Sequence, residues 1–137
     1  MINYESNAII NQPRPKIFEQ MSDLRNLEKY KAAFPNNADI EMQFTQDSIL
    51  IKTLQFGQVI VRLVEKKEEE NFKFSIENSP VTANFYVKLD KIETEKTQIQ
   101  LVLEADIPFF LRPIIGDKLQ SGIDKATEII AISLNRC

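Results

Sequence analysis

The chain has 137 residues, of which 43% are hydrophobic and 27% are charged, as in an ordinary folded globular domain. This length suits one domain and is too short for two comfortable ones, so we predict a single domain over residues 1–137. Its 17 basic and 20 acidic side chains give a net charge of -3, which offers no general attraction to nucleic acid or to an anionic membrane.

Several chemistries are excluded by the residue types present. The chain has no histidine, and its one cysteine, Cys137, is the last residue. A disulfide framework, a His-based metal site and a Ser-His-Asp or Cys-His catalytic site are therefore ruled out, and we expect no metal and no cofactor. Residues 1–10 lack the features of a signal peptide, and no segment approaches the roughly 18 apolar residues of a membrane span. We therefore expect a cytoplasmic protein without stable membrane insertion.

The first elements are a strand and two short helices. Tyr4, Ala8 and Ile10 follow the two-residue period of a strand. Pro13 and Pro15 fit only the start of a helix. The first helix carries Ile17, Phe18 and Met21, and the second, capped by Ser22 or Asp23, carries Leu24, Leu27 and Tyr30 before Pro35, Asn36 and Asn37 end the helical region.

From residue 39 to residue 107 the hydrophobic period is mostly two, which predicts six strands joined by short links. Residues 48–56 carry apolar side chains in both registers, so their buried face stays open. Residues 65–71, EKKEEEN, are predicted to be a solvated hairpin tip, with partner docking as the alternative. The clearer runs place these residues on one face: Ile40, Met42 and Phe44; Val59, Val61 and Leu63; Phe72, Phe74 and Ile76; Val81, Ala83, Phe85, Val87 and Leu89; Ile99, Leu101, Leu103, Ala105 and Ile107.

The last segment changes to a helical period. Pro108 marks the end of the last strand, and Pro113 is tolerated in the first turn of a helix because its missing N–H would be unpaired there anyway. About 24 residues of helix span roughly 36 Å, enough to run along the whole sheet. Its apolar side is predicted to carry Ile115, Leu119, Gly122, Ile123, Ala126, Ile130 and Leu134.

This order of elements resembles the START-like superfamily (SRPBCC), which includes Bet v 1-like and polyketide cyclase/dehydratase-like proteins. The local match is PRPKIFEQMSDLRNLEKY, residues 13–30, which looks like the family's proline turn, aromatic-bearing helix and Ser-Asp pair. The resemblance implies an α+β helix-grip fold: a seven-stranded curved antiparallel sheet wrapped around a long C-terminal helix, with two short helices between strands one and two. Family members include lipid carriers, ubiquinone-binding proteins, hormone receptors, cyclases and co-chaperones, and the fold alone does not choose among them.

The residue pattern most directly favours a protein that binds a ligand. A twisted sheet curled round one helix encloses more space than three helices readily fill, and an unfilled apolar space suits a hydrophobic ligand. The leading hypothesis is that the chain binds, transports or sequesters a hydrophobic or amphipathic small molecule or lipid, without catalysis. A cyclase- or dehydratase-like enzyme and a co-chaperone-like module with a filled core, whose protein partner would be unknown, remain the alternatives.

The expected ligand-binding residues lie on the inward face and at one end of it. Periodicity places eight of them between sheet and helix: Phe44, Phe74, Phe85, Ile99, Leu101, Leu119, Gly122 and Ile123. Tyr4 could bring a hydroxyl to a ligand head group or could simply pack in the core. Phe109 and Phe110 either line the mouth of a cavity or plug the end of the core; an exposed patch there would favour the partner-binding module.

Two further features have competing interpretations. Gly122, in mid-helix, either permits close packing against the sheet or leaves room for a ligand. The carboxylate pairs Asp39 with Glu41 and Glu104 with Asp106 are the remaining catalytic option, but their alternation with apolar residues predicts a solvated face.

Overall fold

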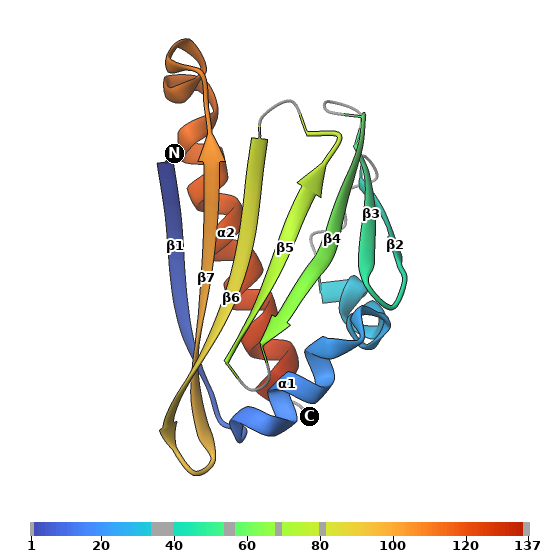
Figure 1. Cartoon of the computed structure of the whole chain (residues 1–137), viewed down its shortest axis with the longest axis vertical. Helices are drawn as coiled ribbons and strands as arrows, with labels where there is room; N and C mark the ends of the chain where they lie inside the picture. Colours follow the sequence, from blue (N-terminus) through green and yellow to red (C-terminus); the bar gives the residue numbers. More distant parts are fainter. Residues whose placement is uncertain (1, 34–39, 54–56, 68–69, 80–81, 136–137) are drawn as a thin grey trace.

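The computed structural model describes residues 2–33, 40–53, 57–67, 70–79 and 82–135 (Figure 1). These residues form seven strands, two α-helices and two 3₁₀ helices. The elements are β1 (Ile2–Ile10), α1 (Arg14–Ser22), η1 (Leu24–Ala33), β2 (Ile40–Phe44), β3 (Ser48–Thr53), β4 (Gly57–Lys67), β5 (Asn71–Glu77), β6 (Thr82–Glu93), β7 (Lys96–Asp106), η2 (Phe109–Leu111) and α2 (Arg112–Asn135).

The strands form one antiparallel sheet in the order β1-β7-β6-β5-β4-β3-β2. Strands β2 to β7 make the predicted meander, and β1 pairs with β7, so that Tyr4 lies opposite Leu103. The predicted helix-grip architecture is confirmed. The residues predicted to end the helical region, Pro35 to Asn37, and the predicted inward residue Val81 lie outside the described residues.

The two short helices begin where the sequence predicts. Pro13 precedes the first residue of α1 and Pro15 lies in its first turn, where a missing N–H costs no helix bond. The Asp23 carboxylate accepts a hydrogen bond from the Arg25 backbone N–H at 3.0 Å, so Asp23 caps the second helix. Ser22 instead donates its hydroxyl to the Phe18 carbonyl at 2.6 Å. The second helix is a 3₁₀ helix rather than a second α-helix.

The core lies on the face of the sheet that carries the helices, which we call the inward face. Side chains directly opposite one another on paired strands share a face. Ile99 and Leu101 on β7, Phe72 on β5 and Ile17 on α1 are almost fully buried there. Helix α2 packs mainly along β1 and β7, and Figure 1 shows it running obliquely behind the sheet from β7 toward α1.

Two hairpins are longer than the hydrophobic pattern predicts. The stretch predicted as a hairpin tip, residues 65–71, includes three residues that still belong to β4, and β5 resumes at Asn71. Likewise β6 continues to Glu93 and β7 begins at Lys96. The added strand ends carry mostly charged side chains, from Glu65 to Lys67 on β4 and at Lys91 and Glu93 on β6, so they lack the alternation from which a strand is recognised.

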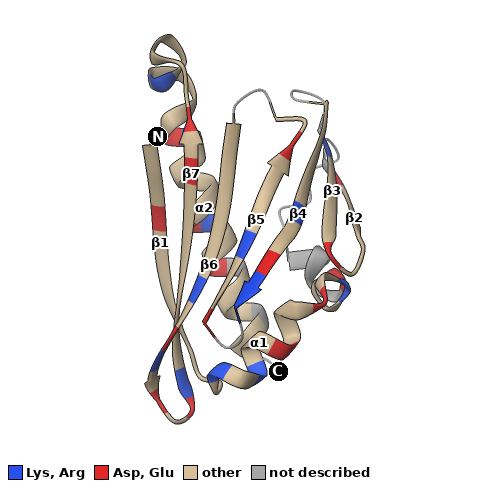
Figure 2. Ribbon diagram, in the orientation of Figure 1, with Lys and Arg blue, Asp and Glu red and all other residues tan. Residues whose placement is uncertain are grey.

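Charged residues are mixed in sign over the molecule. Figure 2 shows Lys and Arg interspersed with Asp and Glu along the strands and at the β6–β7 hairpin. The view shows no broad surface of one sign, in keeping with the balanced composition.

Candidate functional site

The inward face of the sheet is built from rows of paired side chains. One row crosses five strands, from Leu63 on β4 through Phe74, Phe85 and Leu103 to Tyr4 on β1. A second row joins Ile49, Val61, Ile76, Ala83 and Ala105 in the same way. The pairing answers the open question for residues 48–53, since Ile49 and Ile51 face inward and Leu50 lies opposite Ile60 on the other face; residues 54–56 lie outside the described residues.

Helix α2 is fixed over β1 and β7. The Gln120 side-chain amide donates to the Glu5 carbonyl at 3.1 Å, and the Tyr4 hydroxyl lies 3.4 Å from where a Cβ on Gly116 would stand. Ile123 and Leu134 are buried against the sheet. Tyr4 therefore points inward, as the sequence allowed, with its hydroxyl at the helix rather than in an open space.

An aromatic chain anchors α1. The rings of Phe18 and Phe72 stack with centroids 4.9 Å apart, Phe72 lies 6.4 Å from Phe74, and Phe74 lies 5.7 Å from Phe85. Such pairs contribute about 1 kcal/mol beyond the area that they bury. The chain connects α1 with β5 and β6 and fills this part of the interior.

The inward face away from α2 is less completely covered. Ile49, Val61, Leu63, Ile76 and Phe85 pack against the core, yet each keeps part of its surface accessible. By contrast Phe74, Ile99 and Leu101 are at most 3% exposed. The accessible apolar surface therefore lies over β3 to β6.

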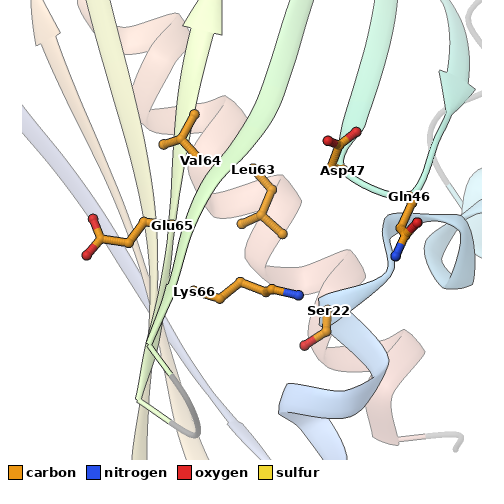
Figure 3. A pocket seen from close by; sticks show the side chains of 7 residues that line it. All are labelled: Ser22, Gln46, Asp47, Leu63, Val64, Glu65 and Lys66. Carbon is orange, nitrogen blue, oxygen red and sulfur yellow. The ribbon is translucent and has the colours of Figure 1, made fainter.

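A pocket of about 370 Å³ opens beside this surface, between β4, the β2–β3 turn and the end of α1 (Figure 3). Leu63 and Val64 supply its apolar part. Its other lining residues are polar or charged: Ser22, Gln46, Asp47, Glu65 and Lys66. Figure 3 shows the Lys66 side chain extending toward Ser22, whereas the Glu65 side chain points the other way.

A β-bulge determines which of these side chains enter the pocket. The ladder pairs Leu63 with Phe74, skips Val64, and resumes with Glu65 opposite Lys73 and Lys66 opposite Phe72. Because Phe72 faces inward, Lys66 faces inward as well. Simple alternation from Leu63 would have placed Glu65 there instead.

The charges around the pocket differ in how far they are neutralised. Asp23 holds Arg25 in a two-pronged ion pair, with its Oδ2 2.6 Å from the guanidinium, and this hydrogen bonding lowers the pKa of the Asp23 carboxyl. Arg62 pairs with Glu77 at 3.1 Å on the outward face. In the described part of the chain the ion pairs are Arg25–Asp23, Arg62–Glu77, Lys67–Glu70 and Lys96–Glu93, and Lys66 belongs to none of them.

The outward face carries the carboxylates that the sequence suggested as a catalytic option. Glu104 lies opposite Asn84 and Asn3, and Glu41 and Asp106 are exposed, while Asp39 lies outside the described residues. Burial raises the pKa of the Tyr86 hydroxyl, and a hydrogen bond to Glu104 raises it further. Glu104 therefore has a structural role as the hydrogen-bond partner of Tyr86, on the face of the sheet away from the helices.

The sequence-predicted ligand residues divide into three groups in the structure. Tyr4, Phe44, Phe85 and Leu119 are partly exposed. Phe74, Ile99, Leu101 and Ile123 are buried in the packed core. Gly122, Phe109 and Phe110 lie on the surface.

Two expectations are corrected by these positions. Gly122 is not on the buried face of α2, because Leu119, Ile123 and Ala126 define a stripe that passes beside it, and a Cβ there would meet nothing within 4 Å. Close packing against the sheet therefore does not explain this glycine. Phe109 and Phe110 do not plug the core either, since they are 83% and 72% exposed.

The pocket residues Ser22, Gln46 and Lys66 were missed by the sequence interpretation. No hydrophobic pattern marks a bulge, and EKKEEE reads as a uniformly solvated stretch. The available signal was Val64, an apolar residue directly after the inward Leu63, which breaks the alternation at the bulge.

Neither a metal-binding cluster nor a membrane-spanning helix is found among the described residues. Among them, no group of three or more acidic, Cys or His side chains is arranged to hold a metal ion. Within the same ranges, no helix combines the length and apolar composition that crossing a membrane requires.

Comparison with known proteins identifies the fold. The sequence matches no protein-family model and no curated protein. A START superfamily protein from Mycobacterium smegmatis has a similar structure, with a TM-score of 0.65, 11% identity, and coverage of 98% of this chain and 94% of that one. The protein has a START-like helix-grip fold.

Two further solved structures share this fold. A norcoclaurine synthase from Thalictrum flavum, solved with a transition-state analogue, has a TM-score of 0.77 at 9% identity, over 98% of this chain and 95% of that one. The Aha1 dimer from Colwellia psychrerythraea has a TM-score of 0.64 at 12% identity, over 98% and 94%. At these identities the likeness establishes the fold of this START-like chain and leaves its ligand or partner open.

Proposed function

We propose that the protein binds a hydrophobic or amphipathic small molecule or lipid against the inward face of the sheet, beside α2, and carries or sequesters it without catalysis. The observation that carries this proposal is the accessible apolar surface over β3 to β6, formed by Ile49, Val61, Leu63, Ile76 and Phe85. Apolar surface on the concave side of a sheet gains free energy when a ligand removes it from water.

The proposed contacts are the partly exposed members of the sequence-predicted set. Phe44 and Phe85 would touch the ligand from the sheet, and Leu119 and Tyr4 from the side of α2. Phe74, Ile99, Leu101 and Ile123 would support them from the packed core beneath. We also propose a cytoplasmic location, for which the support is the cysteine content of the sequence, one cysteine in 137 residues.

Native mass spectrometry of freshly purified protein, followed by solvent extraction, tests whether a small molecule is bound. The companion measurement is the affinity for a fluorescent hydrophobic probe. Phe85→Ala removes an inward ring and is expected to weaken probe binding about tenfold, since burying such a ring contributes roughly 1.5 kcal/mol. Tyr86→Ala is the matched control, because its neighbouring ring projects from the other face of β6.

A protein that is consistently empty and binds no hydrophobic probe would contradict the proposal. Equal loss in Phe85→Ala and Tyr86→Ala would also contradict it, because that result traces the loss to β6 stability rather than to the inward face. Unfolding of both variants in urea provides the comparison of stability.

A second candidate, a partner-binding module, is favoured by one observation. Phe109, Phe110 and Ile114 are 83%, 72% and 60% exposed, and η2 with the start of α2 extends beyond the end of the sheet (Figure 1). Clustered exposed apolar side chains are typical of interaction surfaces. We call these three residues the apolar tip.

Replacing Phe109 and Phe110 together with Ser tests this candidate. If the apolar tip holds a protein partner, cross-linking in native extract gives a defined adduct with the unchanged protein and none with the double variant, while probe binding stays the same. Ile132→Ser is the control, because it removes another exposed apolar side chain far along α2 from the apolar tip. Identical adducts from all three proteins would rule out the apolar tip as the contact.

A further inference from the structure

The pocket beside β4 contains one cationic side chain with no ionic partner. Lys66 lines the pocket, and in the described part of the chain it forms no ion pair. The bulge at Val64 turns its side chain onto the inward face, opposite the buried Phe72. A lysine in this position lies at the end of an apolar surface rather than on the solvated side of the sheet.

The polar groups beside Lys66 supply one further donor for an oxygen anion. Gln46 brings a side-chain amide that can donate to an oxygen. The Ser22 hydroxyl donates its proton to the Phe18 carbonyl, so it offers only lone pairs, which suit a hydroxyl of a ligand and not a carboxylate. Asp23, the acidic residue next to Ser22, forms its ion pair with Arg25, and the more distant charge of Lys66 also lowers the pKa of its carboxyl.

The two carboxylates that line the pocket have different effects. Glu65 lies opposite Lys73 on the outward face, and its side chain points away from Lys66 (Figure 3). Asp47 accepts a hydrogen bond from the Thr45 hydroxyl at 3.3 Å and keeps its negative charge near the pocket. Asp47 should therefore oppose the binding of an anion, and Glu65 should have little influence.

Leu63 connects the pocket with the proposed ligand surface. It lines the pocket and also begins the inward row that continues through Phe74 and Phe85. A molecule lying on this row would bring one of its ends to Lys66. The required ligand is therefore amphipathic, with a negatively charged oxygen group at one end.

We propose that Lys66 is the counter-ion for the carboxylate of an amphipathic acid whose apolar part lies on Leu63 and the inward row. This inference rests on the proposed function and adds the chemical class of the ligand. Recognition combines apolar contact with one charge-assisted hydrogen bond at the open end of the site.

Decanoate and decanol are the probes, because they have the same alkyl chain and differ in the charge of the head group. Displacement of a fluorescent probe gives their affinities for the unchanged protein and for Lys66→Gln. We expect Lys66→Gln to bind decanoate about fivefold more weakly, as for a partly exposed ion pair, and to bind decanol as before. Asp47→Asn should bind decanoate about twofold more tightly, because a repulsive charge is removed.

Lys73→Gln is the matched control. It removes the same charge from the neighbouring strand, but Lys73 lies on the outward face, with its ammonium 5.8 Å from the centre of the Tyr86 ring. If Lys73→Gln weakens decanoate binding as much as Lys66→Gln does, general electrostatics explains the effect and the inference is overturned. If Lys66→Gln leaves decanoate binding unchanged, the inference is overturned while the proposed function stands.

Failure of the proposed function gives a different result. In that case neither decanoate nor decanol displaces the probe from the unchanged protein, and both the function and the inference are overturned. Circular dichroism of each variant accompanies the titrations. Lys66 and Asp47 are exposed and Lys73 is partly exposed, so their substitutions are expected to leave the fold intact.

Discussion

At the residue scale, two glycines have opposite structural requirements. Gly122 is in the interior of α2, where an added Cβ would meet open space. Gly57 has a φ of +70°, a backbone conformation that side-chain-bearing residues rarely adopt. Space alone therefore does not predict which glycine can be replaced.

We predict that Gly122→Ala raises the free energy of unfolding by about 1 kcal/mol, because alanine loses less backbone entropy in a helix. Gly57→Ala should lower it by about 1 kcal/mol, since its backbone would be strained. Urea denaturation measures both changes. A destabilised Gly122→Ala would mean that α2 packs closely at this position.

Tyr86 makes stability depend on alkaline pH. Burial and the Glu104 hydrogen bond raise the pKa of its hydroxyl in the folded state. The neutral form is therefore favoured by folding, and its contribution to stability is complete below the ordinary tyrosine pKa, near 10. This contribution is lost as the pH rises through the folded-state pKa.

We predict that Glu104→Gln lowers the pKa of Tyr86 toward its ordinary value and weakens this alkaline dependence. Titration of phenolate absorbance in the folded protein follows the pKa, and urea unfolding at several alkaline pH values follows the stability. Asp106→Asn is the control, because Asp106 is exposed on the same strand and lies opposite Thr82 rather than Tyr86. An unchanged tyrosine titration in Glu104→Gln would disprove the assigned cause.

At the element scale, deleting one residue of β4 should have different effects at the bulge and within the regular ladder. Val64 has no partner in the β4–β5 ladder, and it is 51% exposed. Ile60 lies within the regular ladder, opposite Leu50 and Glu77. Removing a residue from a regular ladder transfers every later side chain to the other face.

We predict that deletion of Val64 leaves a folded protein with Lys66 still facing inward, at a cost of about 1 kcal/mol for the lost twist. Deletion of Ile60 should prevent folding. The dispersion of amide signals in NMR spectra and urea unfolding distinguish these outcomes. Equal damage from the two deletions would show that the bulge is required for β4 to pair.

The strand pattern was predictable to the extent that one face of each strand is buried. Alternation identified the inward residues of β4 to β7, because burial selects apolar side chains at every second position. It failed at residues 65–67, because all three side chains there are charged although Lys66 lies opposite the buried Phe72. The inward position of Lys66 was also not predicted, because a bulge changes the face on which the following side chains lie without changing the composition of the strand.

At the scale of the whole molecule, the helix-grip architecture was predictable from the order and lengths of the elements. The packing of α2 was less so: its apolar pattern included Gly122, yet the helix is rotated so that Ile123 and Leu134 are buried and Gly122 is not. A stripe wider than the contact surface does not fix the rotation of a helix. The extent of exposed apolar surface depends on this rotation, which explains why the site was only partly predictable.

The pairing of β1 with β7 also determines when the sheet can finish forming during synthesis. Strand β1 leaves the ribosome well before its ladder partner β7, and α2, which packs on β1, follows later still. Closing so long a loop makes contacts of high sequence separation, which slow folding. Until β7 emerges, β1 has no ladder partner, so its backbone N–H and C=O groups and its inward apolar side chains are open to contact with other chains.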